Sequence, residues 1–330
     1  MAVNRSYLWT IPLLCVATLA VSSAGPAFRE VPESNPILSA SWRLQVTFAL
    51  QIPLAIMDRV RNKEACAKLW IQNSPLLVLI AGVSLGLHFS LWVWSLALTS
   101  LAESLLFVTI SPLLIVGGSF ALCKKVGRWE LSGTLVGFAG CALVAFGSGS
   151  TEGSSVAGDL VACLGAVMVC GYLLIGKVMR EERGVALFYY LCPINFLAAV
   201  TAYVCAVAYS VDSAGHIFSW IPTHYAPYIL YLGIVPGIVG HALLNFLLVH
   251  LSPLLISVFI TMEPIIGSVI GWVMGIQGVP GALTWAGGAC IIVGNALVTV
   301  QGVTQSPDSA QKSVASSLLH PAKDQGLIGD

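Results

Sequence analysis

The sequence predicts an all-α integral membrane protein in which ten transmembrane helices form two inverted five-helix repeats. Of its 330 residues, 57% are hydrophobic and only 9% are charged, which is more apolar surface than one soluble core could bury. The apolar residues occur in continuous runs rather than in alternation, which favours helices over the strands of a membrane barrel. In addition, matched residues recur at a nearly constant distance along the chain.

Each apolar run is about long enough to cross a bilayer as a helix. The runs are residues 8–27, 36–57, 75–97, 101–122, 129–147, 159–176, 185–209, 226–248, 252–275 and 281–300. They divide into a first five-helix repeat over 1–147 and a second over 158–300. The Gly- and Ser-rich stretch 148–157 is predicted to be a flexible linker, and the polar, Ser-rich stretch 301–330 a disordered cytoplasmic tail.

The first run has an alternative interpretation. Arg5, the apolar stretch after it and Ser22-Ser23-Ala24 together resemble a secretory signal with its cleavage site. Removal of this segment would leave the first repeat one helix short of the second. The match between the two repeats therefore favours a retained transmembrane helix.

The internal repeat is visible in residues that share an offset. Small residues four apart let helices approach closely, so the glycine pairs Gly82/Gly86, Gly133/Gly137 and Gly233/Gly237 are expected at helix–helix contacts. The matches are Phe107, Thr109 and Pro112 with Phe259, Thr261 and Pro264 at an offset of 152, Gly82 and Gly86 with Gly233 and Gly237 at 151, and Gly133 and Gly140 with Gly287 and Gly294 at 154.

The distribution of basic residues predicts the orientation. With ten spans, 13 of the 15 Lys and Arg residues fall on one side of the membrane, which the positive-inside rule assigns to the cytoplasm. Both termini are then cytoplasmic. Because each repeat has an odd number of spans, the second repeat must enter the membrane upside down relative to the first. Nothing in the sequence indicates which membrane is concerned.

Composition also argues against several classes of function. A net charge of zero gives no reason to expect a nucleic-acid partner, and the odd number of nine cysteines, nearly all in apolar runs or basic loops, makes a disulfide framework unlikely to be the organising feature. No cluster of His, Cys, Asp or Glu suits a metal or a nucleophile with its base, so we expect no enzyme, metal or cofactor. The expected partners are a small-molecule solute and the lipid bilayer, with a monomer and a homodimer both left open.

The strongest candidate site residue is Glu263. A carboxylate in the middle of an apolar run should face protein or a water-filled cavity, where it could take up and release a proton. Phe259 lies one turn before it, and Phe107 and Ser111 lie on the equivalent facet of the first repeat, so we expect these four residues to face one cavity. Alternatively, Glu263 only joins helices by hydrogen bonds.

Two prolines accompany this facet. Pro112 and Pro264 each remove a backbone hydrogen bond inside an apolar run, so we interpret them as matched flex points. Glu103 shares the facet in the first repeat. It also begins its helix, where the helix dipole favours a carboxylate, and this simpler explanation is preferred for it.

A second group of candidates is aromatic or polar. His88 and Trp92 lie one turn apart in the third run, and His241 and Asn245 lie one turn apart in the eighth. Aromatic walls with a few polar tips suit a small amphipathic organic solute. The alternatives are that Trp92 belongs to an interfacial belt and that each histidine only joins helices by a hydrogen bond.

Arg43 is the one basic residue well inside an apolar run. It could bind an anionic solute or pair with Glu103, or its side chain could snorkel to the outer surface. Asp159 stands where the sixth run begins, and we expect it to cap that helix.

The order of these motifs resembles the EamA-type branch of the drug/metabolite transporter superfamily, over nearly the whole chain. The resemblance implies ten helices with both termini cytoplasmic, and a central cavity between two inverted halves that moves amino acids, purines or other small metabolites or drugs. The Gly-Glu pair usual after the fourth and ninth helices is missing. The motifs are Asn35-Pro36 followed by Arg43, His88-Phe89-x-x-Trp92, Ser111-Pro112, Gly158-Asp159-Leu160, Ser252-Pro253-Leu254 and Glu263-Pro264.

We therefore expect a secondary carrier or facilitator that moves small non-phosphorylated organic solutes, such as amino acids or related metabolites, by alternating access. Proton coupling through Glu263 is one option for its driving force. The main alternative is a nucleotide-sugar or sugar-phosphate type carrier of an endomembrane or organelle. A phosphate, however, calls for fixed cations, and only Arg43 is available. A non-transporting scaffold and an intramembrane enzyme are the remaining alternatives.

Overall fold

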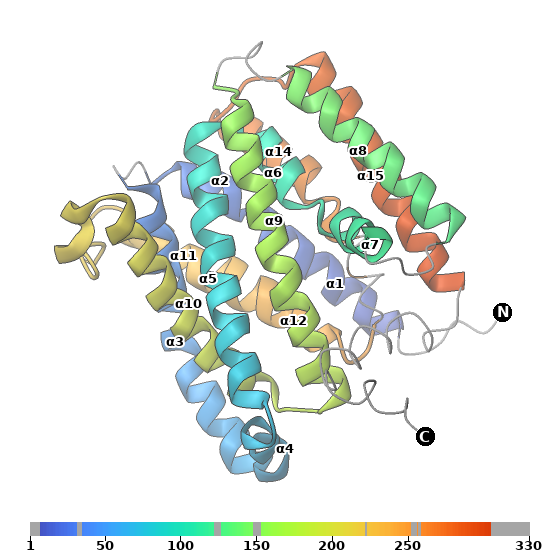
Figure 1. The fold of residues 1–330 in the computed structure, drawn as a ribbon. Coiled ribbons are helices and arrows are strands. Elements are labelled where there is room, and N and C mark those ends of the chain that lie inside the picture. The colour runs from blue at the N-terminus through green and yellow to red at the C-terminus, as the bar shows by residue number, and fades with distance from the viewer. Residues whose placement is uncertain are drawn as a thin grey trace, which may run out of the picture.

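The computed structural model describes residues 7–31, 35–121, 127–147, 153–221, 223–251, 256 and 259–304. Within this part of the chain every regular element is a helix, and the helices pack side by side (Figure 1). Three predicted segments fall wholly or partly outside the described residues: Ser252-Pro253-Leu254, the tail beyond Thr304, and residues 148–152 of the linker.

The first part of the chain forms the helices that precede the linker. Asn35 caps α3 because its side chain accepts a hydrogen bond from the backbone N–H of Ile37, while Pro36 occupies the first position, which needs no donor. These helices are α1 (Tyr7–Ser22), α2 (Ala24–Arg29), α3 (Pro36–Arg61), α4 (Lys63–Ala67), α5 (Ser74–Leu98), α6 (Leu101–Val108), α7 (Ser111–Ala121) and α8 (Arg128–Gly147), with a 3₁₀ turn η1 (Lys68–Trp70) before α5.

The second part begins at α9, whose N-cap Ser155 accepts from the backbone N–H of Gly158. Asp159 lies in the first turn but is not the cap, which corrects that expectation. The elements are α9 (Val156–Lys177) with a π-helical end η2 (Val178–Glu182), α10 (Leu187–Tyr209), a 3₁₀ turn η3 (Val211–Gly215), α11 (Ala226–Leu232), a π-helical stretch η4 (Gly233–Ala242), α12 (Leu243–Leu247), α14 (Glu263–Val273) and α15 (Ala282–Thr304).

Two of the expected helices are interrupted rather than continuous. The run 101–122 is divided between α6 and α7, and a separate helix, α14, begins at Glu263 within the run 252–275. Pro112 and Pro264 each stand second in the new helix, where a missing N–H leaves no intrahelical bond unmade. Glu263 is therefore not in the middle of a continuous helix, as expected from the sequence, but at a helix N-terminus, where the dipole favours its negative charge.

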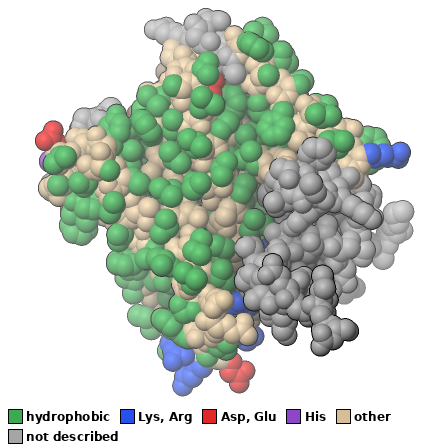
Figure 2. All heavy atoms as spheres, in the orientation of Figure 1, with side chains coloured by type: hydrophobic (Ala, Val, Ile, Leu, Met, Phe, Trp, Pro, Cys, Tyr) green, Lys and Arg blue, Asp and Glu red, His purple; other side chains and the backbone are tan. Residues whose placement is uncertain are grey.

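Five described helices are long and apolar enough to cross a membrane: Trp9–Arg29, Ser74–Leu98, Val156–Glu182, Leu187–Tyr209 and Ala226–Leu247. Leu101–Leu114, Glu263–Val273 and Ala282–Leu297 are apolar but shorter. One face of the molecule is covered largely by hydrophobic side chains, with Lys and Arg gathered at the end where α4 lies (Figure 2). The chain is thus an integral membrane protein with several spans.

The glycine pairs lie at helix contacts, as predicted. A Cβ atom on Gly82 of α5 would lie 2.5 Å from Cβ of Leu197 in α10, and one on Gly233 of η4 would clash with Val46 in α3. An offset of 151 relates both partners, because it takes Gly82 to Gly233 and Val46 to Leu197. The same close contact is therefore made twice, once with each pair of helices.

The α8 and α15 helices pack along each other and run antiparallel (Figure 1). A Cβ atom on Gly140 would lie 2.6 Å from the carbonyl oxygen of Gly287, and one on Gly294 would lie 2.5 Å from the carbonyl oxygen of Gly133. Residues that come later in α8 thus meet residues that come earlier in α15. The offset of 154 takes Gly133 to Gly287 and Gly140 to Gly294, so each of the two contacts is the counterpart of the other.

Candidate functional site

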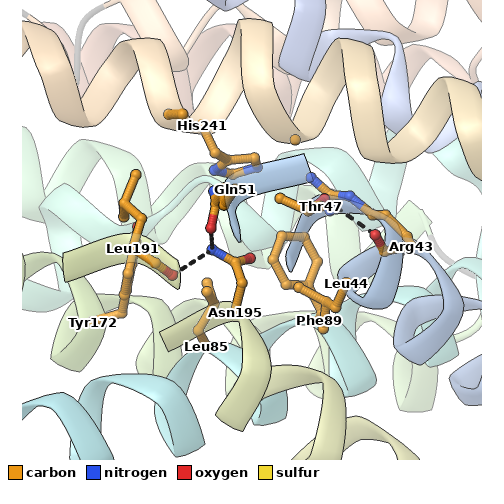
Figure 3. A pocket seen from close by; sticks show the side chains of 12 residues that line it. Arg43, Leu44, Thr47, Gln51, Leu85, Phe89, Tyr172, Leu191, Asn195 and His241 are labelled. Atoms are coloured by element: carbon orange, nitrogen blue, oxygen red, sulfur yellow. Dashed lines mark hydrogen bonds between the residues drawn. The ribbon is translucent and has the colours of Figure 1, made fainter. Parts of the chain in front are cut away.

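A narrow cavity lies between α3, α5, α9, α10 and η4 (Figure 3). It holds about 300 Å³ of space between atoms, with room for little more than one water molecule. Its walls combine apolar side chains with one cation, two amides, a phenol, a hydroxyl and an imidazole. The lining residues are Arg43, Leu44, Thr47, Gln51, Leu85, Phe89, Tyr172, Leu191, Asn195, Gly237, His241 and Ala242.

Arg43 supplies the cation. Its side chain is only 1% exposed, so it does not snorkel to the surface, and that alternative is wrong. The guanidinium carbon lies 4.1 Å from the centre of the Phe89 ring, and Nε donates to the carbonyl oxygen of Leu232 at 3.3 Å. Within the described chain, Nη1 is buried without a hydrogen-bond partner, and Arg43 forms no ion pair with Glu103 or any other carboxylate. Figure 3 shows its guanidinium group above the Phe89 ring.

A pair of amides forms the opposite end of the cavity. Asn195 Nδ2 donates to Gln51 Oε1 at 3.1 Å and to the carbonyl oxygen of Leu191 at 3.0 Å (Figure 3). Sequence reasoning missed both residues. The signal for Gln51 was present, because Arg43, Thr47 and Gln51 are spaced by four residues and so share one face of α3. Asn195 stands alone in an apolar run and offered no such pattern.

Asn245 reaches the cavity wall through Tyr172. Its Nδ2 donates to the Tyr172 hydroxyl at 2.9 Å and to the carbonyl oxygen of His241 at 2.9 Å. Its Oδ1 and the hydroxyl of Tyr190 are both buried and without a hydrogen-bond partner in the described chain. Both lie near Gly176, since a Cβ atom there would be 3.6 Å from the Tyr190 hydroxyl and 3.8 Å from Asn245 Oδ1. Tyr172 and Tyr190 were not singled out from the sequence.

His88 and Trp92 stand next to Phe89 rather than at the cavity surface. Nδ1 of His88 lies 2.9 Å from the carbonyl oxygen of Gly165, which joins α5 to α9. The two rings are nearly parallel, with centroids 6.3 Å apart, and Trp92 meets Phe28 edge to face. Both side chains are buried, so their packing fixes the position of the Phe89 ring under Arg43.

Glu263 is buried at the start of α14 and forms no ion pair with Arg43 in the described chain. The other residues of the expected facet lie elsewhere. Phe107 belongs to an apolar cluster with Leu106, Ile110 and Leu113, whereas Phe259 packs against a different cluster that contains Leu14 and Ala17. Ser111 is half-buried, and its carbonyl oxygen accepts from Cys170 Sγ at 3.7 Å. The structure therefore does not bring this facet together at the cavity described above.

Glu103 and Asp159 meet at a buried polar corner that is separate from the cavity. The Thr99 hydroxyl lies 2.9 Å from Oε2 of Glu103 and 2.8 Å from Oδ1 of Asp159. Arg29 donates to the backbone carbonyl of Thr99 at 2.6 Å. This corner joins α2, the end of α5, α6 and α9, and we interpret it as a structural junction between these helices.

The chemistry of the cavity is that of binding. The described residues contain no group of three or more His, Cys, Asp or Glu side chains that could hold a metal ion. A guanidinium group over an aromatic ring, with amide and hydroxyl groups opposite, can orient a small polar organic molecule.

Comparison with known proteins agrees with this picture. Residues 8–146 match the model of the EamA-like transporter family. A solved structure described only as "Crystal structure of protein" has a TM-score of 0.60 and 20% sequence identity, covering 90% of this chain and 99% of that one. At this identity the likeness shows the fold alone. No curated protein matches by sequence.

Proposed function

We propose that this chain is a carrier for small non-phosphorylated organic solutes, in which two inverted repeats, 1–147 and 158–300, expose a central cavity to each side of the membrane in turn. The observation that carries the proposal is the cavity itself. It is walled by both parts of the chain, with Arg43 and Gln51 before the linker and Tyr172, Asn195 and His241 after it. A site built between two repeats is the arrangement on which alternating access depends.

The glycine contacts support the inverted arrangement. If two repeats are related by a two-fold axis in the membrane plane, equivalent helices that touch must run antiparallel and exchange their contacts. The equivalent helices α8 and α15 do both, because Gly140 meets Gly287 and Gly133 meets Gly294. The proposal of ten spans with both termini in the cytoplasm follows from this symmetry together with the basic loops.

The small volume of the cavity fits a closed intermediate of a transport cycle. A solute larger than a water molecule requires the helices around the cavity to separate. The helix starts at Pro112 and Pro264 are the proposed flex points, since α7 and α14 each begin one residue before the proline.

The charge of the cavity favours solutes without phosphate. A phosphate carries about two negative charges at neutral pH and is held in proteins by several Arg or Lys side chains. Within the described part of the wall, Arg43 is the single cation. Nucleotide-sugar and sugar-phosphate carriers therefore remain the less favoured class.

Uptake into proteoliposomes tests the proposal. The purified protein should accumulate or equilibrate a radiolabelled solute from a panel of amino acids and small metabolites, whereas empty liposomes should not. A pH gradient tests coupling through Glu263: if Glu263 carries the proton, Glu263→Gln should transport at a rate that no longer responds to the gradient. Saturable uptake of a sugar phosphate, with no uptake of unphosphorylated solutes, would contradict the proposal.

A further inference from the structure

We infer that the solute carries a carboxylate, and that Arg43 is the residue that binds it. This inference rests on the proposed carrier function and adds the chemical class of the cargo and its contact. The starting observation is the unpartnered Nη1 of Arg43, on a side chain that is 1% exposed and lines the cavity.

A buried cation without a counter-ion is unfavourable. Removing one partner of a buried ion pair is strongly destabilising, because the other charge stays uncompensated. In the described chain the guanidinium group of Arg43 has a carbonyl oxygen, the Phe89 ring and the more distant Phe28 ring around it, and the rings compensate only part of its charge. A ligand with a negative oxygen at this position would supply the missing partner.

The donor geometry favours a carboxylate in particular. A guanidinium group presents a planar fork of N–H donors that matches the two oxygens of a carboxylate. Nε is engaged with Leu232, which leaves Nη1 free for the ligand. One cation also balances one carboxylate, whereas it leaves a phosphate undercompensated.

Other charged or titratable groups near Arg43 do not replace the ligand. Glu263 forms no ion pair with Arg43 in the described chain, and the imidazole rings of His88 and His241 cannot supply a negative charge. His88 is already engaged with the carbonyl oxygen of Gly165. The described surroundings thus contain no carboxylate that forms an ion pair with Arg43.

The rest of the wall sets the size of the solute. Leu44, Leu85, Leu191 and Phe89 enclose a short apolar body, and the amides of Gln51 and Asn195 lie at the far end. The Tyr172 hydroxyl, which accepts from Asn245 Nδ2, also lines the cavity and can hydrogen-bond an amine or hydroxyl group. Once the helices around the cavity separate, both amino acids and simple hydroxy acids are candidates, and their shared feature is the carboxylate.

Matched pairs of acids and amides test the inference, because each pair differs only in the group expected at Arg43. The pairs are L-alanine with L-alaninamide, L-lactate with L-lactamide, and butyrate with butyramide. Binding is measured as the shift in Tm of the purified protein, and uptake is measured in proteoliposomes. At least one acid should raise the Tm and be taken up. Its amide should bind with an affinity at least about tenfold lower. The three acids distinguish a required amine from a required hydroxyl.

Three variants locate the contact. Arg43→Gln should weaken binding of the acid by about tenfold to a hundredfold and remove the preference over the amide, whereas Arg43→Lys keeps the charge without the fork and should retain part of it. Arg29→Gln is the matched control, since Arg29 lies outside the cavity at the Thr99 corner. It should bind as the unmodified protein does.

The outcomes separate the two proposals. Equal binding of an acid and its amide, unchanged binding by a folded Arg43→Gln variant, or no binding by any of the acids would overturn the inference. The acid–amide comparison in the unmodified protein decides the question even if Arg43→Gln does not fold. Binding that depends on Arg43 without any uptake would leave the carboxylate site standing and contradict the carrier function instead.

Discussion

The two parts of the chain pack alike but contribute different chemistry to the cavity. The offset of 151 that relates the contact of Gly82 with Leu197 to that of Gly233 with Val46 also relates Arg43 to Ile194. It relates Leu44 to Asn195 as well, and both of these line the cavity. At these positions the first part therefore supplies the cavity with a cation and a leucine, whereas the second supplies an amide.

This difference separates positions at helix–helix contacts from positions that face the cavity, which the sequence alone does not distinguish. Positions where backbones approach closely admit only small side chains in either part, so the glycines match. Positions that face the cavity are free of that limit and can differ, as Leu44 and Asn195 do. Substitutions at the two kinds of position should behave differently, and the predictions below are ordered by the size of that effect.

The largest effect is expected at the matched glycines. Gly82→Leu and Gly233→Leu each place a branched side chain where even a Cβ atom would overlap Leu197 or Val46. Overpacking typically costs about 1–3 kcal/mol, and we expect at least the upper end here because both sites are helix–helix contacts. Both variants should lose yield and thermal stability in detergent to a similar extent. Gly278→Leu is the control, because no described atom lies within 4 Å of a Cβ atom at that position. A stable Gly233→Leu beside an unfolded Gly82→Leu would break the equivalence.

The next largest effect is expected at the polar corner around Thr99. A substitution there should destabilise the fold, whereas a substitution at the related position in the second part should not. Thr99→Val removes the hydroxyl between the buried carboxyl groups of Glu103 and Asp159, which should reduce the free energy of unfolding by about 2 kcal/mol. The offset of 151 relates Thr99 to His250, which is exposed, so His250→Val should have little effect. Thermal melts of the two variants measure the difference. Equal melting temperatures would show that the corner does not stabilise the fold.

A smaller effect is expected from the amide pair of the cavity. Asn195→Leu makes this position like its counterpart Leu44 but leaves Gln51 Oε1 without its donor, which should reduce the free energy of unfolding by about 1 kcal/mol. The double variant Gln51→Leu/Asn195→Leu removes both partners and should recover part of the loss. A double-mutant cycle of thermal stability measures the coupling. Strictly additive losses would mean that the hydrogen bond contributes nothing.

The smallest effect concerns the loop after α3. Burial, and after it the nearby carboxylate of Asp58, raises the pKa of the Cys66 thiol above its ordinary value. A raised pKa means less thiolate near neutral pH, so Cys66 should react with maleimide more slowly than an exposed cysteine introduced at Asn73, and its rate should rise at higher pH. The labelling rate of each single-cysteine variant is measured between about pH 6 and 10, a range that brackets the ordinary pKa of a thiol. Equal rates and equal midpoints would place Cys66 at an accessible surface.

Much of the scaffold could be predicted from the sequence. Apolar runs located the helices, and the glycine pairs identified the contacts between them, because both depend on local composition. The helix breaks shifted Glu263 from a mid-helix position to a helix N-terminus, since a proline near a helix start is as compatible with the sequence as one inside it.

The site was predictable only in part. Arg43 stood out because a cation in an apolar run is conspicuous. Tyr172 and Asn195 reach the cavity from helices that are distant in sequence, and the partnership of Thr99 with Asp159 joins residues 60 apart. Phe107 and Phe259 share an offset but lie in different apolar clusters, because equivalence in the repeat does not require a shared cavity.

The orientation of the two repeats is tested most directly by labelling a pair of equivalent loop positions. Asn73 and His224 are both exposed and are related by the offset of 151. Each is replaced by cysteine in a cysteine-free background and treated in intact cells with a membrane-impermeant maleimide. We predict that His224→Cys is labelled from outside and that Asn73→Cys is labelled only after the membrane is opened. Labelling of both positions from the same side would contradict the inverted arrangement.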